Sequence, residues 1–79
     1  MKLAKKARLR FDRHEGRWMI VYPERGLLLN ESGAAIAKKL DGTRTLDQVV
    51  DELVAEAGAD PADVRAFVAD LDKRGLIDR

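Results

Sequence analysis

The feature that most constrains this chain is a change of hydrophobic period near residues 22–30. Before it, apolar residues alternate with charged ones or form a short β-branched run, whereas after it they recur at helical spacing. Asn30 marks the change, because its side chain can accept hydrogen bonds from the free amides of a helix that begins at Glu31. The sequence therefore predicts a strand-rich first third and a helical remainder.

Two strands are predicted in the first third of the chain. In residues 8–12, Leu9 and Phe11 alternate with charged residues, which is the pattern of a half-buried strand. Residues 18–22 are apolar, aromatic or β-branched on both faces. Such a segment suits the middle of a sheet, or a sheet whose second face is covered by a partner.

A turn and a third, short strand are expected next. Pro23 cannot donate a ladder hydrogen bond and Gly26 tolerates positive φ, so residues 23–26 are predicted to form the turn. Residues 27–29 then form an apolar strand. If this strand lies at the edge of the sheet, its unpaired amides and carbonyls are a template for another chain.

Three helices are predicted after Asn30, and they cover residues 31–40, 46–57 and 61–74. Thr45 and Gln48 have the spacing of a capping box at the start of the second helix. Asp60 and Pro61 are suited to the N-cap and first position of the third. Strands followed by helices predict an α+β domain with a small three-stranded antiparallel sheet followed by three helices. The last two helices and the Gly-Leu-Ile segment after them also look winged-helix-like.

The chain has 79 residues, which predicts one domain with a thin core. Residues 1–7 contain three lysines and no apolar period, so a flexible basic arm is expected there, followed by a single domain over residues 8–79. There is no cysteine and no apolar run of about 18 residues that would span a membrane. We expect a cytoplasmic protein without a membrane partner.

The small net charge hides an asymmetry. Residues 1–29 hold eight basic and three acidic side chains, and residues 30–79 hold seven and eleven. The basic first third is suited to nucleic acid, a membrane surface or an acidic partner.

Catalytic chemistry has little support in the sequence. The chain has one serine, Ser32, one histidine, His14, and no cysteine. Ser32 beside Asn30 suits an alternative helix cap, and the glycines are scattered at turn and cap positions instead of forming a phosphate loop. We expect a protein that is not an enzyme and has no metal site and no cofactor.

Two other classes of protein compete with a peptide-binding domain. A winged helix-turn-helix would place residues 61–73 in DNA, but that segment has a net charge of −1 where phosphate neutralisation calls for a basic surface. The basic first third keeps DNA binding as the alternative. A small structural or toxin-antitoxin-like interaction domain comes third.

Several short motifs, in this order and spacing, resemble the PqqD family of pyrroloquinoline quinone (PQQ) biosynthesis. They extend over nearly the whole chain, and they are Arg8-Leu9-Arg10-Phe11-Asp12, Gly16-Arg17-Trp18, Tyr22-Pro23-Glu24-Arg25, Leu29-Asn30, Asp41-Gly42-Thr43-Arg44-Thr45 and the segment 71–76. The small residues at 33–35 depart from the family, in which bulkier residues would fit equally well.

The resemblance implies a peptide chaperone, a recognition element for ribosomally made and modified peptides (RiPPs). It would bind the precursor peptide PqqA and present it to the radical SAM enzyme PqqE, with no nucleic acid involved. The peptide would add as a strand at residues 26–29 and lie against the third helix. The peptide-binding residues implied are Arg25, Gly26, Leu27, Leu28, Leu29, Val64, Phe67, Val68 and Leu71.

Strand addition also follows from the residues themselves, since an edge gives sequence-tolerant backbone hydrogen bonds and apolar side chains beside it give specificity. Leu28 points to the opposite face from its two leucine neighbours, so one set is core and the other borders the groove; the sequence does not say which. Arg25 is a candidate partner for a peptide carboxylate. Trp18 and Tyr22 are candidate contacts for the partner enzyme. A monomer is expected, with a strand-exchanged dimer as the alternative.

Overall fold

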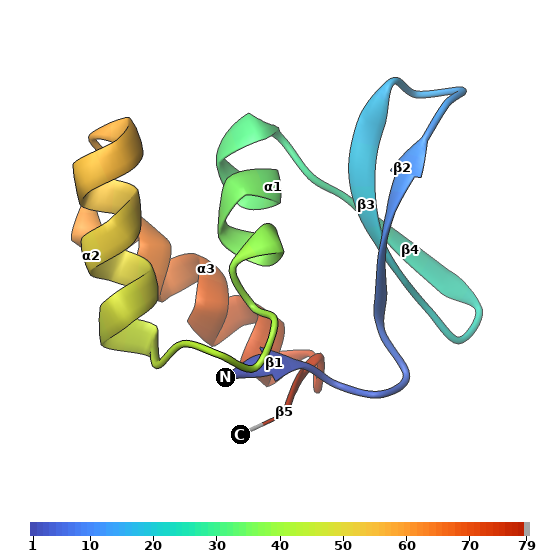
Figure 1. Ribbon diagram of the computed structural model, residues 1–79. Coiled ribbons are helices and arrows are strands. Elements are labelled where there is room, and N and C mark those ends of the chain that lie inside the picture. Colours follow the sequence, from blue (N-terminus) through green and yellow to red (C-terminus); the bar gives the residue numbers. More distant parts are fainter. Residues whose placement is uncertain (79) are drawn as a thin grey trace.

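A computed structural model describes residues 1–78 (Figure 1). Over these residues the chain forms a three-stranded sheet, three helices and a separate two-stranded sheet. The elements in chain order are β1 (Lys2–Leu3), β2 (Arg8–Asp12), β3 (Arg17–Tyr22), β4 (Arg25–Leu28), α1 (Glu31–Lys38), α2 (Leu46–Ala57), α3 (Pro61–Lys73) and β5 (Ile77–Asp78). The predicted α+β class and the order of strands and then helices are confirmed.

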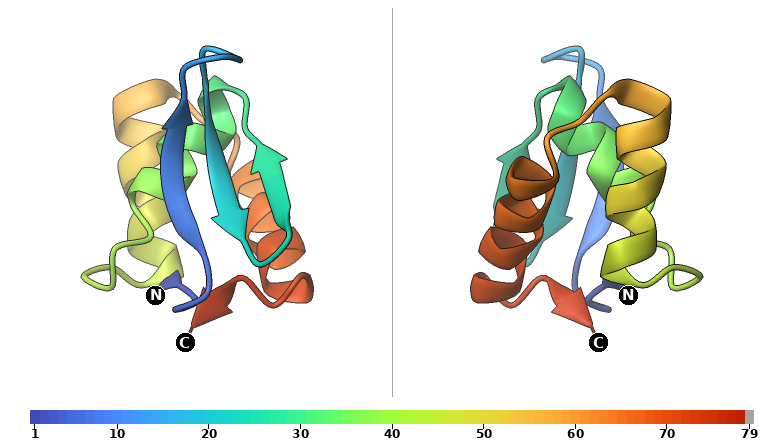
Figure 2. Two further views of the ribbon diagram at one scale, coloured as in Figure 1. Left: turned by 90° about the vertical axis from the view of Figure 1, so that its right-hand side faces the viewer. Right: turned by 90° about the vertical axis from the view of Figure 1, so that its left-hand side faces the viewer.

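The three-stranded sheet is antiparallel with the order β2-β3-β4, so β3 is central and β4 lies at an edge. Phe11 of β2 stands opposite Trp18 of β3, and Met19 of β3 stands opposite Leu28 of β4. All three helices lie on one side of this sheet, which leaves its other face open (Figure 2).

The turn between β3 and β4 is shorter than predicted. It consists of Pro23 and Glu24, and β4 already begins at Arg25. Glu24 has the positive φ, 63°, which was expected for Gly26. Gly26 instead lies within β4, where the terminal methyl of Met19 occupies the space that a Cβ would need. Gly26 is therefore a strand residue with a close side-chain neighbour and not the turn residue that the sequence predicts.

The helix starts are those that the sequence predicts. Asn30 accepts a hydrogen bond from the Gly33 amide at 2.7 Å, and Thr45 and Gln48 form both halves of a capping box. Asp60 accepts from the Ala62 amide with Pro61 at the first helical position. Each cap satisfies an amide that has no partner within its helix.

The core lies between the sheet and the helices. Its most completely buried side chains come from the central strand, from α2 and α3, and from the residue just before β5; they are Ile20, Val49, Val64, Leu71 and Leu76. Leu29, directly after β4, is also buried. The end of the sheet is therefore held against the helical layer.

The N-terminal segment differs from the flexible arm expected for residues 1–7. β1 pairs antiparallel with β5, and the Ala4 amide donates to the Leu76 carbonyl at 2.8 Å. Ala7 is buried in the core. No sequence pattern predicts this pairing, because β1 has only two residues and its partner strand lies more than 70 residues away.

Candidate functional site

The β4 edge, defined as the side of β4 that faces away from β3, offers free backbone groups. The Leu29 amide donates to the Trp18 carbonyl at 2.9 Å, so the backbone groups of Leu29 point toward β3. Antiparallel pairs alternate between bonded and non-bonded positions, so the backbone groups of Leu27 also point toward β3. Those of Gly26 and Leu28 point outward. An incoming strand would find two amides and two carbonyls there.

The three leucines divide between the two faces of the sheet. Leu29 is 3% exposed and Leu27 is half-buried against the core. Leu28 is 37% exposed and points to the open side of the sheet. The question that the sequence left open is therefore answered: Leu27 and Leu29 are the core set, and Leu28 is the surface residue.

Helix α3 supplies one candidate wall beside the β4 edge. Val64, Val68 and Leu71 are buried in the core, as their helical spacing also indicated, so Phe67 is the member of this stripe that reaches the surface. A Cβ built on Gly33 would lie 3.0 Å from Phe67 Cε2. The glycine at the start of α1 thus leaves room for this ring.

The other end of α3 lies near the turn between β3 and β4. Arg74, which caps α3, pairs with Asp70 at 3.0 Å. Asp70 raises the pKa of Arg74, and a hydrogen bond with the Tyr22 side chain contributes to the same shift. Viewed from the open side of the sheet, α3 lies behind β4 (Figure 2, left). Phe67 thus lies against the start of α1, and Arg74 lies near the end of β3.

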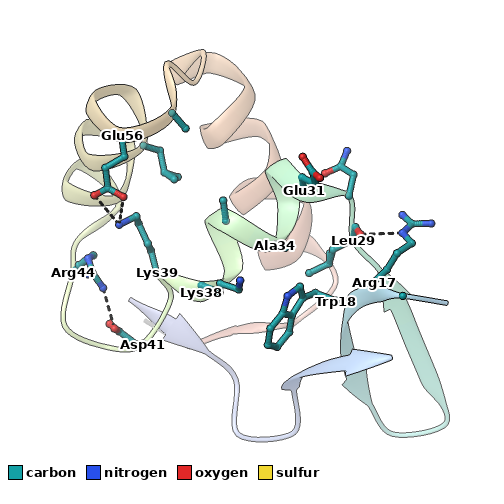
Figure 3. A pocket seen from close by; sticks show the side chains of 15 residues that line it. Arg17, Trp18, Leu29, Glu31, Ala34, Lys38, Lys39, Asp41, Arg44 and Glu56 are labelled. Atoms are coloured by element: carbon teal, nitrogen blue, oxygen red, sulfur yellow. Dashed lines mark hydrogen bonds and ion pairs between the residues drawn. The ribbon is translucent and has the colours of Figure 1, made fainter. Parts of the chain in front are cut away.

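Trp18 is half-buried on the helix side of the sheet. Its ring meets Phe11 edge-to-face at a centroid distance of 5.5 Å, and the Lys38 ammonium lies 4.6 Å from its centroid. Figure 3 shows Trp18 below α1, with Lys38 next to it. Lys38 stands in the last turn of α1, twenty residues from Trp18, and no sequence pattern indicates their contact.

An open groove of about 1000 Å³ lies between α1, α2 and the start of β3 (Figure 3). Trp18 and Leu29 border it, together with small side chains such as Ala34 and Ala35. The other residues predicted for peptide binding do not line it. This groove is thus a second candidate binding region, separate from the β4 edge.

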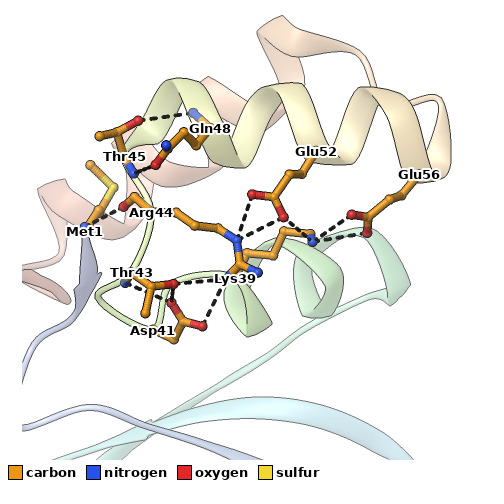
Figure 4. A network of polar contacts seen from close by, with 9 residues as sticks. All are labelled: Met1, Lys39, Asp41, Thr43, Arg44, Thr45, Gln48, Glu52 and Glu56. Atoms are coloured by element: carbon orange, nitrogen blue, oxygen red, sulfur yellow. Dashed lines mark hydrogen bonds and ion pairs between the residues drawn. The ribbon is translucent and has the colours of Figure 1, made fainter.

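A network of ion pairs ties α1, the following loop and α2 together (Figure 4). Lys39 pairs with Glu52 at 3.0 Å, and Arg44 pairs with Glu52 at 2.8 Å and with Asp41 at 2.9 Å. Hydrogen bonds from Thr43 and from Arg44 lower the pKa of Asp41 to about 2. Lys39 and Arg44 likewise lower the pKa of Glu52.

The same network reaches the chain start, since the Met1 ammonium donates to the Arg44 carbonyl at 2.7 Å. Each charged side chain of this network, namely Lys39, Asp41, Arg44, Glu52 and Glu56, forms an ion pair with another member. The ion pairs explain the positions of these side chains without a bound ligand. Among residues 1–78 no group of three or more metal-ligating side chains comes together. No helix in this part of the chain is long and apolar enough to cross a membrane.

Comparison with known proteins places this arrangement in a family. The family model described as Coenzyme PQQ synthesis protein D (PqqD) matches residues 17–77. This range is most of the chain and includes β3, β4 and all three helices. The chain belongs to the PqqD family. The family that the sequence motifs suggested is therefore confirmed.

Named relatives of this PqqD-family chain are similar over most of their length. A "PqqA binding protein" of Xanthomonas oryzae pv. oryzae (strain PXO99A) is 44% identical over 64 residues, which are 81% of this chain and 70% of that protein. A protein of the same name from Rhodopseudomonas palustris (strain BisB5) is 35% identical over 95% of this chain and 78% of its own.

Two solved structures share the PqqD fold with this chain. One is the solution NMR structure of the PqqD truncation of Methylobacterium extorquens PqqCD, described as a functional and stand-alone RiPP recognition element. It has a TM-score of 0.73 at 30% identity, covering 99% of this chain and 87% of its own. The crystal structure of PqqD from Xanthomonas campestris has a TM-score of 0.62 at 30% identity, covering 100% and 92%.

Proposed function

We propose that this chain is a non-catalytic peptide chaperone of PQQ biosynthesis. It binds the ribosomal precursor peptide PqqA as an additional strand on β4 and presents it to the radical SAM enzyme PqqE. Membership of the PqqD family supports the pathway. The names of the relatives, and the description of the Methylobacterium structure as a recognition element, support peptide binding.

The observation that carries the proposal is the direction of the backbone groups on β4. Gly26 and Leu28 present an amide and a carbonyl each to the free edge, while the Leu29 amide is already bonded to Trp18. A peptide strand that pairs with these groups gains backbone hydrogen bonds whatever its sequence. The chain needs no deep pocket to hold such a ligand.

Specificity would come from the side chains on the two sides of the added strand. Successive side chains of a strand point to opposite faces of the sheet. One set from the peptide would face α3, where Phe67 is half-buried and Asp70 and Arg74 are exposed. The other set would stand beside Leu28 on the open side. An apolar residue over Phe67 is therefore the expected anchor of the peptide.

An amide-shift titration of the labelled protein with a PqqA peptide tests the proposal. Shifts concentrated on residues 25–29 and around Phe67 are expected. Shifts concentrated instead on Trp18, Ala35 and Lys38 would move the site to the open groove. No shifts at high peptide excess would contradict peptide binding, and duplex DNA is then the next ligand to titrate.

Presentation to the enzyme requires a second measurement. The chain, a PqqA peptide and PqqE are mixed in pairs and together, and the masses of the complexes are determined by light scattering. A three-component complex in which the chain joins peptide and enzyme is expected. A peptide that leaves the chain whenever PqqE binds would contradict presentation.

A further inference from the structure

The second face of the three-stranded sheet is left open by the helices and has a distinct composition. Residues that stand opposite each other in a sheet share a face, and neighbours along a strand alternate between faces. The pairings of β2, β3 and β4 therefore define one outward set, called here the open face. Its members are Arg8, Arg10, Asp12, Arg17, Met19, Val21, Gly26 and Leu28.

The centre of the open face is apolar. Met19 and Val21 are half-buried and Leu28 is exposed, although no helix covers them. Met19 lies across Gly26, and its terminal methyl occupies the space that a side chain there would need. Beside Met19 and Val21 the surface is hollowed by about 450 Å³. A large side chain from another protein can enter such a hollow.

The charges around this centre are positive. Arg8 and Arg10 belong to the open face and are exposed. Arg17 is also exposed and starts from this face, but its Nε donates to the Leu29 carbonyl at 3.1 Å. Its one carboxylate, Asp12, accepts hydrogen bonds from the amides of His14 and Glu15 in the next turn. Two copies of this face would bring like charges together, so a symmetric pairing of copies is disfavoured. An apolar patch with an acidic rim is complementary.

We propose that the open face is the docking surface for the enzyme that receives the peptide, through an apolar patch ringed by Asp and Glu. This inference rests on the function proposed above. A peptide strand added to β4 extends the same sheet, so half of its side chains lie on the open face next to Leu28. An enzyme docked there meets the bound peptide directly. Trp18 and Tyr22 lie on the helix side, so this proposal moves the enzyme contact away from them.

Charge reversal on the open face tests the docking proposal in the intact chain. The variant Arg8→Glu/Arg10→Glu changes two exposed side chains of β2, the strand farthest from the β4 edge. The control Lys5→Glu/Lys73→Glu makes the same change in net charge at exposed positions outside this face. Affinities for a PqqA peptide and for PqqE are measured separately by calorimetry at low salt. Circular dichroism checks that both variants are folded.

The open-face variant is expected to bind PqqE at least about tenfold more weakly and the peptide with little change, with the control close to the unaltered chain in both. Unchanged PqqE binding by the open-face variant, or an equal loss in the control, would overturn the docking proposal alone. Loss of PqqE binding in Trp18→Phe instead would assign the contact to the helix side. Salt-sensitive duplex DNA binding that only the open-face variant loses would assign the face to nucleic acid. Absence of peptide binding by the unaltered chain would overturn the proposed function itself.

Discussion

The ring of Phe67 fills the space that a side chain at Gly33 would need. A Cβ on Gly33 would stand 3.0 Å from Phe67 Cε2 and 3.3 Å from Asn30 Oδ1. The same Asn30 oxygen accepts the Gly33 amide at 2.7 Å. The N-cap of α1, its first turn and the middle of α3 thus meet at one point, two residues after β4 ends, where one end of the proposed peptide site lies.

The first prediction concerns this contact. Gly33→Val should destabilise the chain by roughly 1–3 kcal/mol, because the added methyl groups overpack the space that Phe67 fills. Urea unfolding measures the change. Ala35→Val is the matched control, since Ala35 is half-buried on the same helix and borders the open groove. Equal stability losses in the two variants would show that the contact with Phe67 is not the cause.

The second prediction separates the backbone of the β4 edge from its side chains. Leu28→Pro removes an amide that points away from β3, which edge strands tolerate. The variant should stay folded and bind a PqqA peptide at least about tenfold more weakly, the effect of losing one backbone hydrogen bond and its geometry. Leu28→Ala keeps the amide and should retain most of the affinity. If the alanine variant loses as much as the proline variant, the side chain and not the amide binds the peptide.

The third prediction concerns acid stability. Asp41 has a folded pKa of about 2 against an ordinary value of 3.8, and the pKa of Glu52 is also lowered. Groups of this kind stabilise the folded state above their unfolded pKa, and the contribution is lost as the pH falls through the folded pKa. Resistance to urea should therefore fall as the pH is lowered from about 4.5 toward 2.

Its control is Asp41→Asn/Glu52→Gln, which removes both carboxylates of the network. This variant should be less stable than the unaltered chain at pH 7 and should lose less stability over the same acid range. An identical loss on acidification in both proteins would show that other carboxylates determine the response.

The fourth prediction concerns the cation over Trp18. Lys38→Met removes the ammonium that lies 4.6 Å from the ring centroid and should cost about 0.5–1 kcal/mol. Trp18 is the sole tryptophan, so its fluorescence should change in the same variant. Lys73→Met, also in the last turn of a helix, is the control for the loss of charge near a helix C-terminus. If the two substitutions lower the stability equally, the cause is the loss of a positive charge near a helix C-terminus and not the contact with Trp18.

The elements of this fold were predictable because their signals are local. Each helix start depends on residues at most three positions apart in the chain. The side chains of Asn30, Thr45 and Asp60 accept hydrogen bonds from free amides of the first turn, Gln48 completes the capping box, and Pro61 has no amide to satisfy. The alternation of Leu9 and Phe11 predicted β2 for a similar reason.

The candidate site was only partly predictable. Its position on the third strand of the sheet and beside α3 came from the family resemblance and from an apolar segment next to a turn. Which leucine is exposed, and which member of the α3 stripe reaches the surface, depends on how the two layers pack. The positive φ fell on Glu24 and not on Gly26, because the turn consists of Pro23 and Glu24 alone and Gly26 pairs with Val21 inside the sheet.

The sequence by itself determined the class of the fold, the starts of its helices and its family, since each depends on residues close together in the chain or on a motif. Tertiary structure alone decided that the backbone of Gly26 and Leu28 faces outward, because the direction of those groups depends on the register with β3. It also decided that residues 1–7 pack against the C-terminal strand. Contacts between the two ends of a chain leave no periodic signal in either segment.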